Sequence, residues 1–140
     1  MSARRLYRHG FALVLASLLL GFAIVGSGGG VKGRLWLAAH TTGILVGLML
    51  VAAGAAWPSV RLGAGAQRAA GLLLVVGSWT GFVVLGLFTA VMAIPLPVAA
   101  PSLPPVPGWV MAVNGVGIAV VAISILVGWS MVLFGLRGDD

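Results

Sequence analysis

The stretch that decides the fold is LWLAAHTTGILVGLMLVAAGAAW at residues 35–57, which contains no Lys, Arg, Asp or Glu. A membrane-spanning helix needs about 20 mostly apolar residues, so this stretch is long enough to cross a bilayer. Its only ionisable side chain is His40. Because an ionisable group at that depth is costly, His40 is the first candidate for function. A neutral imidazole hydrogen-bonded to a neighbouring helix is the simpler alternative.

The composition of the whole chain is that of an integral membrane protein. Of its 140 residues, 61% are hydrophobic and 7% are charged, and the mean hydropathy is +1.18. Soluble domains carry about 25% charged residues. We therefore expect a single transmembrane domain over residues 1–140. The net charge of +6 comes from basic residues that flank the apolar runs, which indicates membrane topology and not nucleic-acid binding.

Four apolar runs predict an all-α fold, an integral membrane four-helix bundle. Their length and their richness in Leu, Ala and Gly favour helices over buried strands. A Gly-rich turn follows the first run, Pro58 follows the second, and a segment with six of the seven prolines follows the third. The expected helices cover residues 10–26, 35–57, 68–94 and 109–136.

The basic residues predict the orientation of the bundle. Six of the eight fall on one side of the membrane, and only Lys32 and Arg34 fall on the other. Cytoplasmic loops carry an excess of Lys and Arg, so we expect both termini in the cytoplasm, as in a bacterial inner-membrane protein. The proline-rich segment then lies outside, as a plain tether or as a lid across the bundle. The six residues are Arg4, Arg5, Arg8, Arg61, Arg68 and Arg137.

Three polar residues are expected at one depth in the outer half of the membrane. His40, Thr89 and Asn114 each lie five residues from the expected outer end of their helix, about 7–8 Å along its axis. Facing inward, they would form one polar layer. Gly43 and Gly47 share the helical face of His40, so a flat cofactor could approach there; ordinary helix packing is the alternative.

Few other residues could support chemistry. The only carboxylate side chains are Asp139 and Asp140, and the chain has no cysteine. Paired-carboxylate catalysis, a carboxylate proton relay and thiolate metal sites are therefore excluded. One intramembrane histidine is too few for a protein-only zinc site, but haem needs only one axial ligand. His9 lies beside Arg8 at the membrane interface and is not expected to be a metal ligand.

The sequence resembles the small four-helix membrane isomerases, a family that includes hydroxylaminobenzene mutase and styrene oxide isomerase. LYRHGFALVLASLLLGF at residues 6–22 resembles the opening of the mutase. The best motif, Ala-His-x-x-Gly-x-x-x-Gly followed by Trp-Pro, lies within AAHTTGILVGLMLVAAGAAWPSVRLG at residues 38–63. GSWTGF at residues 77–82 and VLFGLRG at residues 132–138 also fit. The likeness covers most of the chain.

The resemblance implies a homotrimer with b-type haem near the subunit contacts and with His40 as the axial metal ligand. The second ring nitrogen is expected to donate to a backbone carbonyl or to the hydroxyl of Thr41 or Thr42. In the isomerase branch, ferric iron acts as a Lewis acid and converts an epoxide to an aldehyde. In the mutase branch, an arylhydroxylamine becomes an aminophenol.

We therefore expect a haem-dependent isomerase that rearranges a small apolar aromatic substrate without a co-substrate. Two positions depart from the family pattern. The family has Asn six residues after the histidine, where this chain has Val46, and a polar residue after the helix-3 Trp, around Thr80 and Gly81 here. Asn114 and Thr89 are candidate catalytic replacements, because they share the expected depth of His40. The alternatives are a haem-binding protein without catalysis and a structural or accessory subunit without a cofactor.

Overall fold

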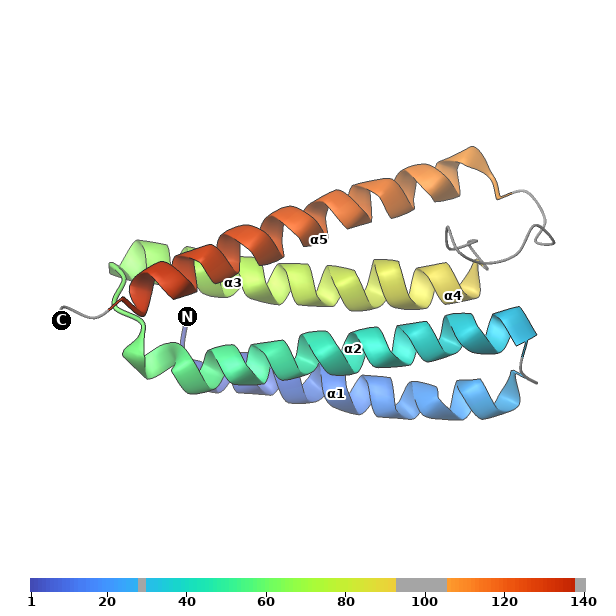
Figure 1. Cartoon of the computed structure of the whole chain (residues 1–140), viewed down its shortest axis with the longest axis horizontal. Helices are drawn as coiled ribbons and strands as arrows, with labels where there is room; N and C mark the ends of the chain where they lie inside the picture. The colour runs from blue at the N-terminus through green and yellow to red at the C-terminus, as the bar shows by residue number, and fades with distance from the viewer. Residues whose placement is uncertain (28–29, 93–105, 138–140) are drawn as a thin grey trace.

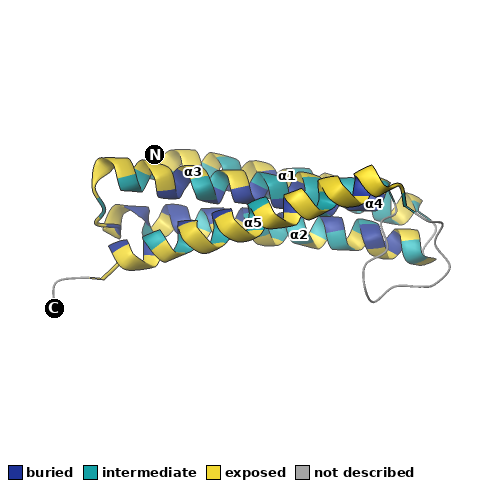
Figure 2. Cartoon of the chain, turned by 90° about the horizontal axis from the view of Figure 1, so that it is seen from above, coloured by how far each residue is buried: buried dark blue, intermediate teal, exposed yellow. Residues whose placement is uncertain are grey.

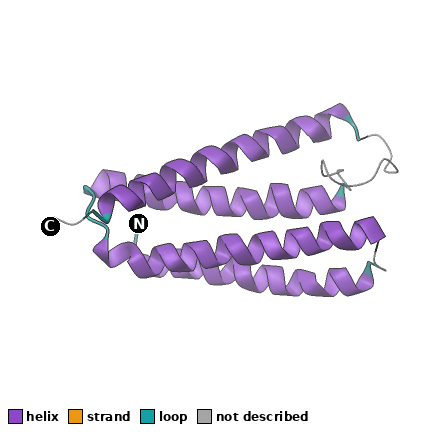
Figure 3. Cartoon of the chain, viewed as in Figure 1, coloured by secondary structure: helices purple, strands orange, loops and turns teal. Residues whose placement is uncertain are grey.

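A computed structural model of the chain describes residues 1–27, 30–92 and 106–137. Within these residues, four helical spans run side by side and there is no strand (Figures 1 and 3). All four are long and apolar enough to cross a membrane, which confirms the expected all-α membrane bundle. The spans are α1 (Ala3–Gly26), α2 (Gly30–Ala56), a third span made of α3 (Ala64–Thr80), η2 (Gly81–Phe88) and α4 (Thr89–Val91), and α5 (Gly108–Gly135).

Three helices begin before the apolar runs that predicted them. α1 begins at Ala3 and not at residue 10, α2 begins at Gly30 and not at residue 35, and α3 begins at Ala64 and not at residue 68. An apolar run marks only the part of a helix inside the bilayer, and Arg, Lys and Gln are good helix formers that extend it into the interface. The expected third helix end at residue 94 and most of the proline-rich segment lie outside the described residues.

The bundle consists of two helix pairs. α1 packs along α2, α3 packs along α5, and the third span joins the pairs through its contact with α2. α1 begins and α5 ends at the same end of the bundle, which we call the terminal end (Figure 1). There η1 (Trp57–Ser59) follows α2, and the Arg61 backbone N–H donates to the carbonyl oxygen of Gly135 over 2.7 Å.

The outer surface of the bundle is apolar. Buried residues line the inside of the helices and exposed residues form the outer faces (Figure 2). Large apolar side chains are common among the exposed residues; Phe22, Val25 and Leu126 are 76%, 84% and 71% exposed. An apolar surface of this extent is expected in contact with lipid and not with water.

Two facing glycines allow α1 and α2 to approach closely. A Cβ atom at Gly10 would lie 2.8 Å from the carbonyl oxygen of Gly47, and a Cβ atom at Gly47 would lie 2.8 Å from that of Gly10. Both positions are buried. Small residues at such crossings let helix backbones pack directly in a membrane.

Gly47→Ala is expected to destabilise the protein by about 1–3 kcal/mol, because the added methyl group overpacks the α1–α2 contact. The measurement is thermal unfolding in detergent, followed by circular dichroism. Gly115→Ala on α5 is the matched control: a Cβ built there would meet no described residue within 4 Å, so the melting temperature should stay the same or rise. Equal melting temperatures for Gly47→Ala and the original protein would contradict this packing.

Candidate functional site

His40 lies on α2 and is half-buried against α1. Its Nδ1 atom lies 2.6 Å from the backbone carbonyl oxygen of Ser17. A carbonyl oxygen only accepts hydrogen bonds, so in the neutral ring Nδ1 carries the proton and Nε2 carries the lone pair. Histidines that bind metals commonly have this arrangement, in which the second nitrogen donates to a carbonyl and fixes the ring. A neutral imidazole that serves only to join two helices would make the same bond. The bond involves only Nδ1, however, and leaves the Nε2 lone pair for a second partner.

Small residues on α1 make room for the imidazole of His40. Gly21 lies one turn after Ser17, and a Cβ atom built there would lie 3.7 Å from His40 Cε1. The Ser17 hydroxyl donates to the Leu13 carbonyl over 2.7 Å and stays within its own helix. A backbone carbonyl, that of Ser17, is thus the partner of His40 Nδ1, as one of the two sequence-based alternatives expected. The Thr41 hydroxyl instead lies within hydrogen-bond distance of carbonyls one turn earlier in α2.

Thr89 and Asn114 meet between the third span and α5. The Thr89 hydroxyl oxygen lies 3.4 Å from Asn114 Oδ1 and 3.2 Å from the Val84 carbonyl oxygen. The hydroxyl has one proton, so it donates to one of these acceptors at a time. When it donates to Oδ1, it fixes the amide and leaves the Asn114 NH2 group as a donor for another oxygen. Thr89 is buried, at 5% exposure, and Asn114 is half-buried.

The expected polar layer of three residues is only partly formed within one chain. Thr89 and Asn114 are joined, but among the described residues His40 hydrogen-bonds to α1 and to neither of them. The physical reason is that counting residues along a helix predicts only how deep a side chain lies in the membrane. The direction of a side chain around its helix decides which neighbour it meets.

The two glycines that share a face with His40 lie in helix contacts. The Phe82 ring and the Ser17 hydroxyl cover Gly43, and the Gly10 backbone and Val14 cover Gly47. Both glycines are buried, so their placement corresponds to helix packing, the alternative stated above. Val46, at the position where the resemblance implies Asn, lies half-buried beside Gly81 of the third span.

A π-helix, η2, changes the register of the third span directly before Thr89. η2 has eight residues, and its wider turns bring Thr89 within reach of the carbonyl of Val84, five residues earlier. Such segments are rare and occur frequently at functional sites. The apolar pattern of residues 68–94 predicted a continuous α-helix and not a π-helical segment. The Gly81 and Gly86 positions within it were a weak signal, because glycine is also common in ordinary membrane helices.

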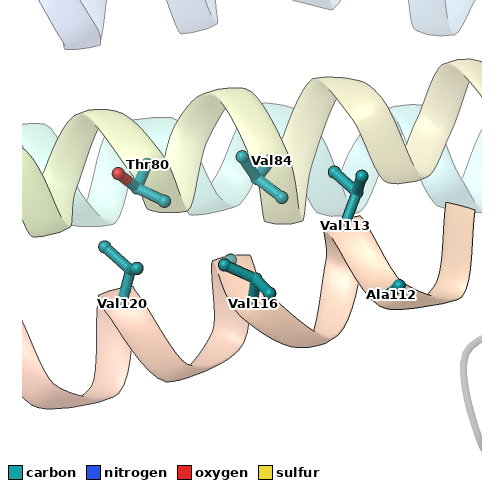
Figure 4. Close-up of a pocket in the computed structure, with 7 residues that line it drawn as sticks. Thr80, Val84, Ala112, Val113, Val116 and Val120 are labelled. Atoms are coloured by element: carbon teal, nitrogen blue, oxygen red, sulfur yellow. The ribbon is translucent and has the colours of Figure 1, made fainter. Parts of the chain in front are cut away.

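An apolar groove of about 410 Å³ lies between the third span and α5. Valines from both helices face each other across it, with Thr80 at one end (Figure 4). Asn114 directly follows the lining residue Val113 on α5, but neither Asn114 nor Thr89 is among the residues that line the groove. The sequence analysis did not predict the groove, although valines at helical spacing around Gly117 could have indicated it. The lining residues are Thr80, Val84, Ala112, Val113, Val116, Gly117 and Val120.

Comparison with known proteins gives two matches. The sequence model of the styrene oxide isomerase family matches residues 2–137. Hydroxylaminobenzene mutase HabB of Ectopseudomonas oleovorans is 39% identical over 80 residues, which cover 57% of this chain and 47% of that protein. The matched region thus spans about half the length of the mutase. No solved structure matches the chain.

Proposed function

This chain belongs to the styrene oxide isomerase family, and from that premise we propose that it is a haem-dependent intramembrane isomerase. Its substrate is a small apolar aromatic molecule, either an epoxide that becomes an aldehyde or an arylhydroxylamine that becomes an aminophenol. The name of the family and the name of its mutase relative support this reaction class. The observation that carries the haem assignment is the hydrogen bond from His40 Nδ1 to the Ser17 carbonyl.

The tautomer of His40 fits the histidine ligand of a b-type haem. Nε2 has the lone pair that a ferric or ferrous iron needs, and the Ser17 carbonyl holds the ring in that tautomer. The described residues contain no group of three His, Cys, Asp or Glu side chains that could hold a metal ion alone. A porphyrin supplies four nitrogens, so one axial histidine is sufficient. Bound there, the iron would supply a Lewis acid for the oxygen of the substrate.

The groove and the Thr89–Asn114 pair bind and orient the substrate. The valine side chains of the groove exclude water and accept an aromatic ring. The amide NH2 of Asn114 donates to the substrate oxygen, while the Thr89 hydroxyl donates to Asn114 Oδ1 and fixes the orientation of the amide. Neither residue takes up a proton, which suits a rearrangement that has no net proton transfer to the protein.

We propose a homo-oligomer, a trimer by family resemblance. His40 belongs to the α1–α2 pair and bonds to α1, whereas the groove and Asn114 lie between the third span and α5. In a cyclic trimer, each interface joins one face of a subunit to a different face of its neighbour. Such an interface would bring His40 of one subunit toward the groove of the next. Native mass spectrometry in mild detergent tests this, and a monomer alone would contradict it.

The direct test of the proposed activity is conversion of styrene oxide or hydroxylaminobenzene by the purified protein without any co-substrate. Because the reaction is a rearrangement, the product must have the mass of the substrate, and chromatography separates the two. We expect conversion of one of the two compounds. Haem-loaded protein that converts neither of them would support the second candidate, a haem-binding protein without catalysis. The presence of Val46 where the family has Asn favours that candidate.

We further propose that the terminal end of the bundle faces the cytoplasm, because six of the eight basic residues belong to that end. The chain has no cysteine, so each introduced cysteine is the only thiol that can be labelled. In cells, Ser2→Cys should react with a membrane-impermeant maleimide only after lysis, and Pro107→Cys should react before it. The reverse pattern would contradict this orientation.

A further inference from the structure

A second cavity, remote from His40 in the sequence, opens beside the first turns of α1. It has a volume of about 430 Å³ and is lined by Arg5, Arg8, His9 and Ala12. The spacing of these residues, three, four and seven positions after Arg5, places them on one face of the helix. Since one water molecule occupies about 30 Å³ of liquid, the cavity has room for a group several times larger.

The histidine in this cavity has a defined tautomer. Trp79 Nε1 donates a hydrogen bond to His9 Nδ1 over 3.2 Å. Indole N–H only donates, so Nδ1 must hold a lone pair, and the neutral ring carries its proton on Nε2. The Trp79 ring is in turn held edge-on by Phe82, with ring centroids 6.3 Å apart. His9 therefore has a structural partner, and its second nitrogen is a fixed hydrogen-bond donor.

The polar groups around the cavity are therefore all donors. Arg5 and Arg8 contribute two permanent positive charges, and His9 contributes an N–H group. No carboxylate side chain neutralises them among the described residues, because Asp139 and Asp140 lie outside that part of the chain. A site with two guanidinium groups and one neutral donor is complementary to a phosphate, which has several acceptor oxygens.

We propose that this cavity binds the phosphate group of an anionic phospholipid. The cavity lies beside the first turns of a helix that is long and apolar enough to cross a membrane, and a lipid headgroup is expected beside the end of such a helix. Phe11 and Leu15, each 61% exposed, follow on the same helix and offer an apolar surface to the acyl chains. Basic pockets of membrane proteins recognise headgroups in this way. Free inorganic phosphate has the same binding chemistry, so the test separates the two sources.

The test is a titration of the full-length protein, purified in detergent, with phosphatidylglycerol, phosphatidylcholine or sodium phosphate. A ligand that binds the folded state raises the melting temperature in a saturable way. We expect this shift with phosphatidylglycerol and not with phosphatidylcholine. Loss of one charge-assisted pair should weaken the binding of phosphatidylglycerol about tenfold in Arg5→Gln and in Arg8→Gln.

Arg4→Gln is the matched control, because Arg4 is exposed in the same turn but does not line the cavity. All three arginines are exposed, so this variant removes the same charge and differs only in leaving the cavity lining intact; the affinity should stay within about twofold. A saturable shift with sodium phosphate alone would also support the phosphate site and would identify its ligand as the free ion. Equal weakening by Arg4→Gln and Arg5→Gln, or no saturable shift with either anion, would overturn the proposal.

Discussion

Replacement of His40 by alanine is expected to remove haem from the purified protein and to abolish isomerisation, while the protein still inserts into the membrane. His40 is the only ionisable side chain of its apolar run, and its Nδ1 is already committed to the Ser17 carbonyl. Without Nε2, α2 would offer no ligand to the proposed haem iron. Changes to outer-shell partners of a metal site already cost about 10–100-fold in affinity, so loss of the ligand itself should exceed that. The measurements are haem per protein by absorbance and product by chromatography.

Thr41→Val is the control for this experiment. Thr41 is the next residue of α2 and is exposed, and its hydroxyl bonds to carbonyls of its own helix. This variant should keep the haem content and the absorption spectrum of the original protein. Full haem occupancy with an unchanged spectrum in His40→Ala would show that the axial ligand lies elsewhere.

The second large effect is expected from Asn114→Ala, which should lower kcat about 10²-fold while haem stays bound. That is the usual cost of removing one preorganised donor that stabilises charge on a reacting oxygen. Thr89→Val keeps the shape of the side chain but releases the amide from its Oδ1 contact. Its effect on kcat should therefore be smaller than that of Asn114→Ala. Steady-state assays of product formation at saturating substrate measure both variants.

Gly115→Ala serves as the control for the pair, since Gly115 is the exposed neighbour of Asn114 and a Cβ built there would lie within 4 Å of no residue in the described part of the chain. Its kcat should equal that of the original protein. A normal kcat in Asn114→Ala would exclude the amide from substrate orientation. The groove valines would then be left to position the substrate by shape alone.

The fold could be predicted because the bilayer imposes a simple rule. Inside the bilayer every backbone N–H and C=O group must be hydrogen-bonded within the protein, and a helix of about 20 apolar residues achieves this by itself. Residues 35–57 are therefore expected to be helical. The starts of the helices could not be predicted as well. Hydrophobicity marks the bilayer boundary, whereas α1 continues to Ala3 through arginines that are compatible with a helix.

The candidate site was only half predictable, for a geometric reason. The shared depth of Thr89 and Asn114 follows from counting residues, and the structure does bring these two together. The direction of His40 depends on which helix packs against α2, and tertiary contacts decide that. The π-helical register of η2 likewise has no strong local signal. The sequence therefore predicts the depth of a side chain in the membrane but not the direction in which it points around its helix.

The visible absorption spectrum of the detergent-purified, full-length protein tests the central claim most directly. If His40 holds a b-type haem in an active isomerase, the spectrum shows a Soret band, and the band and the isomerase activity rise together as haem is added. A folded protein that has no Soret band after incubation with haem, yet still rearranges the substrate at its full rate, would contradict the claim.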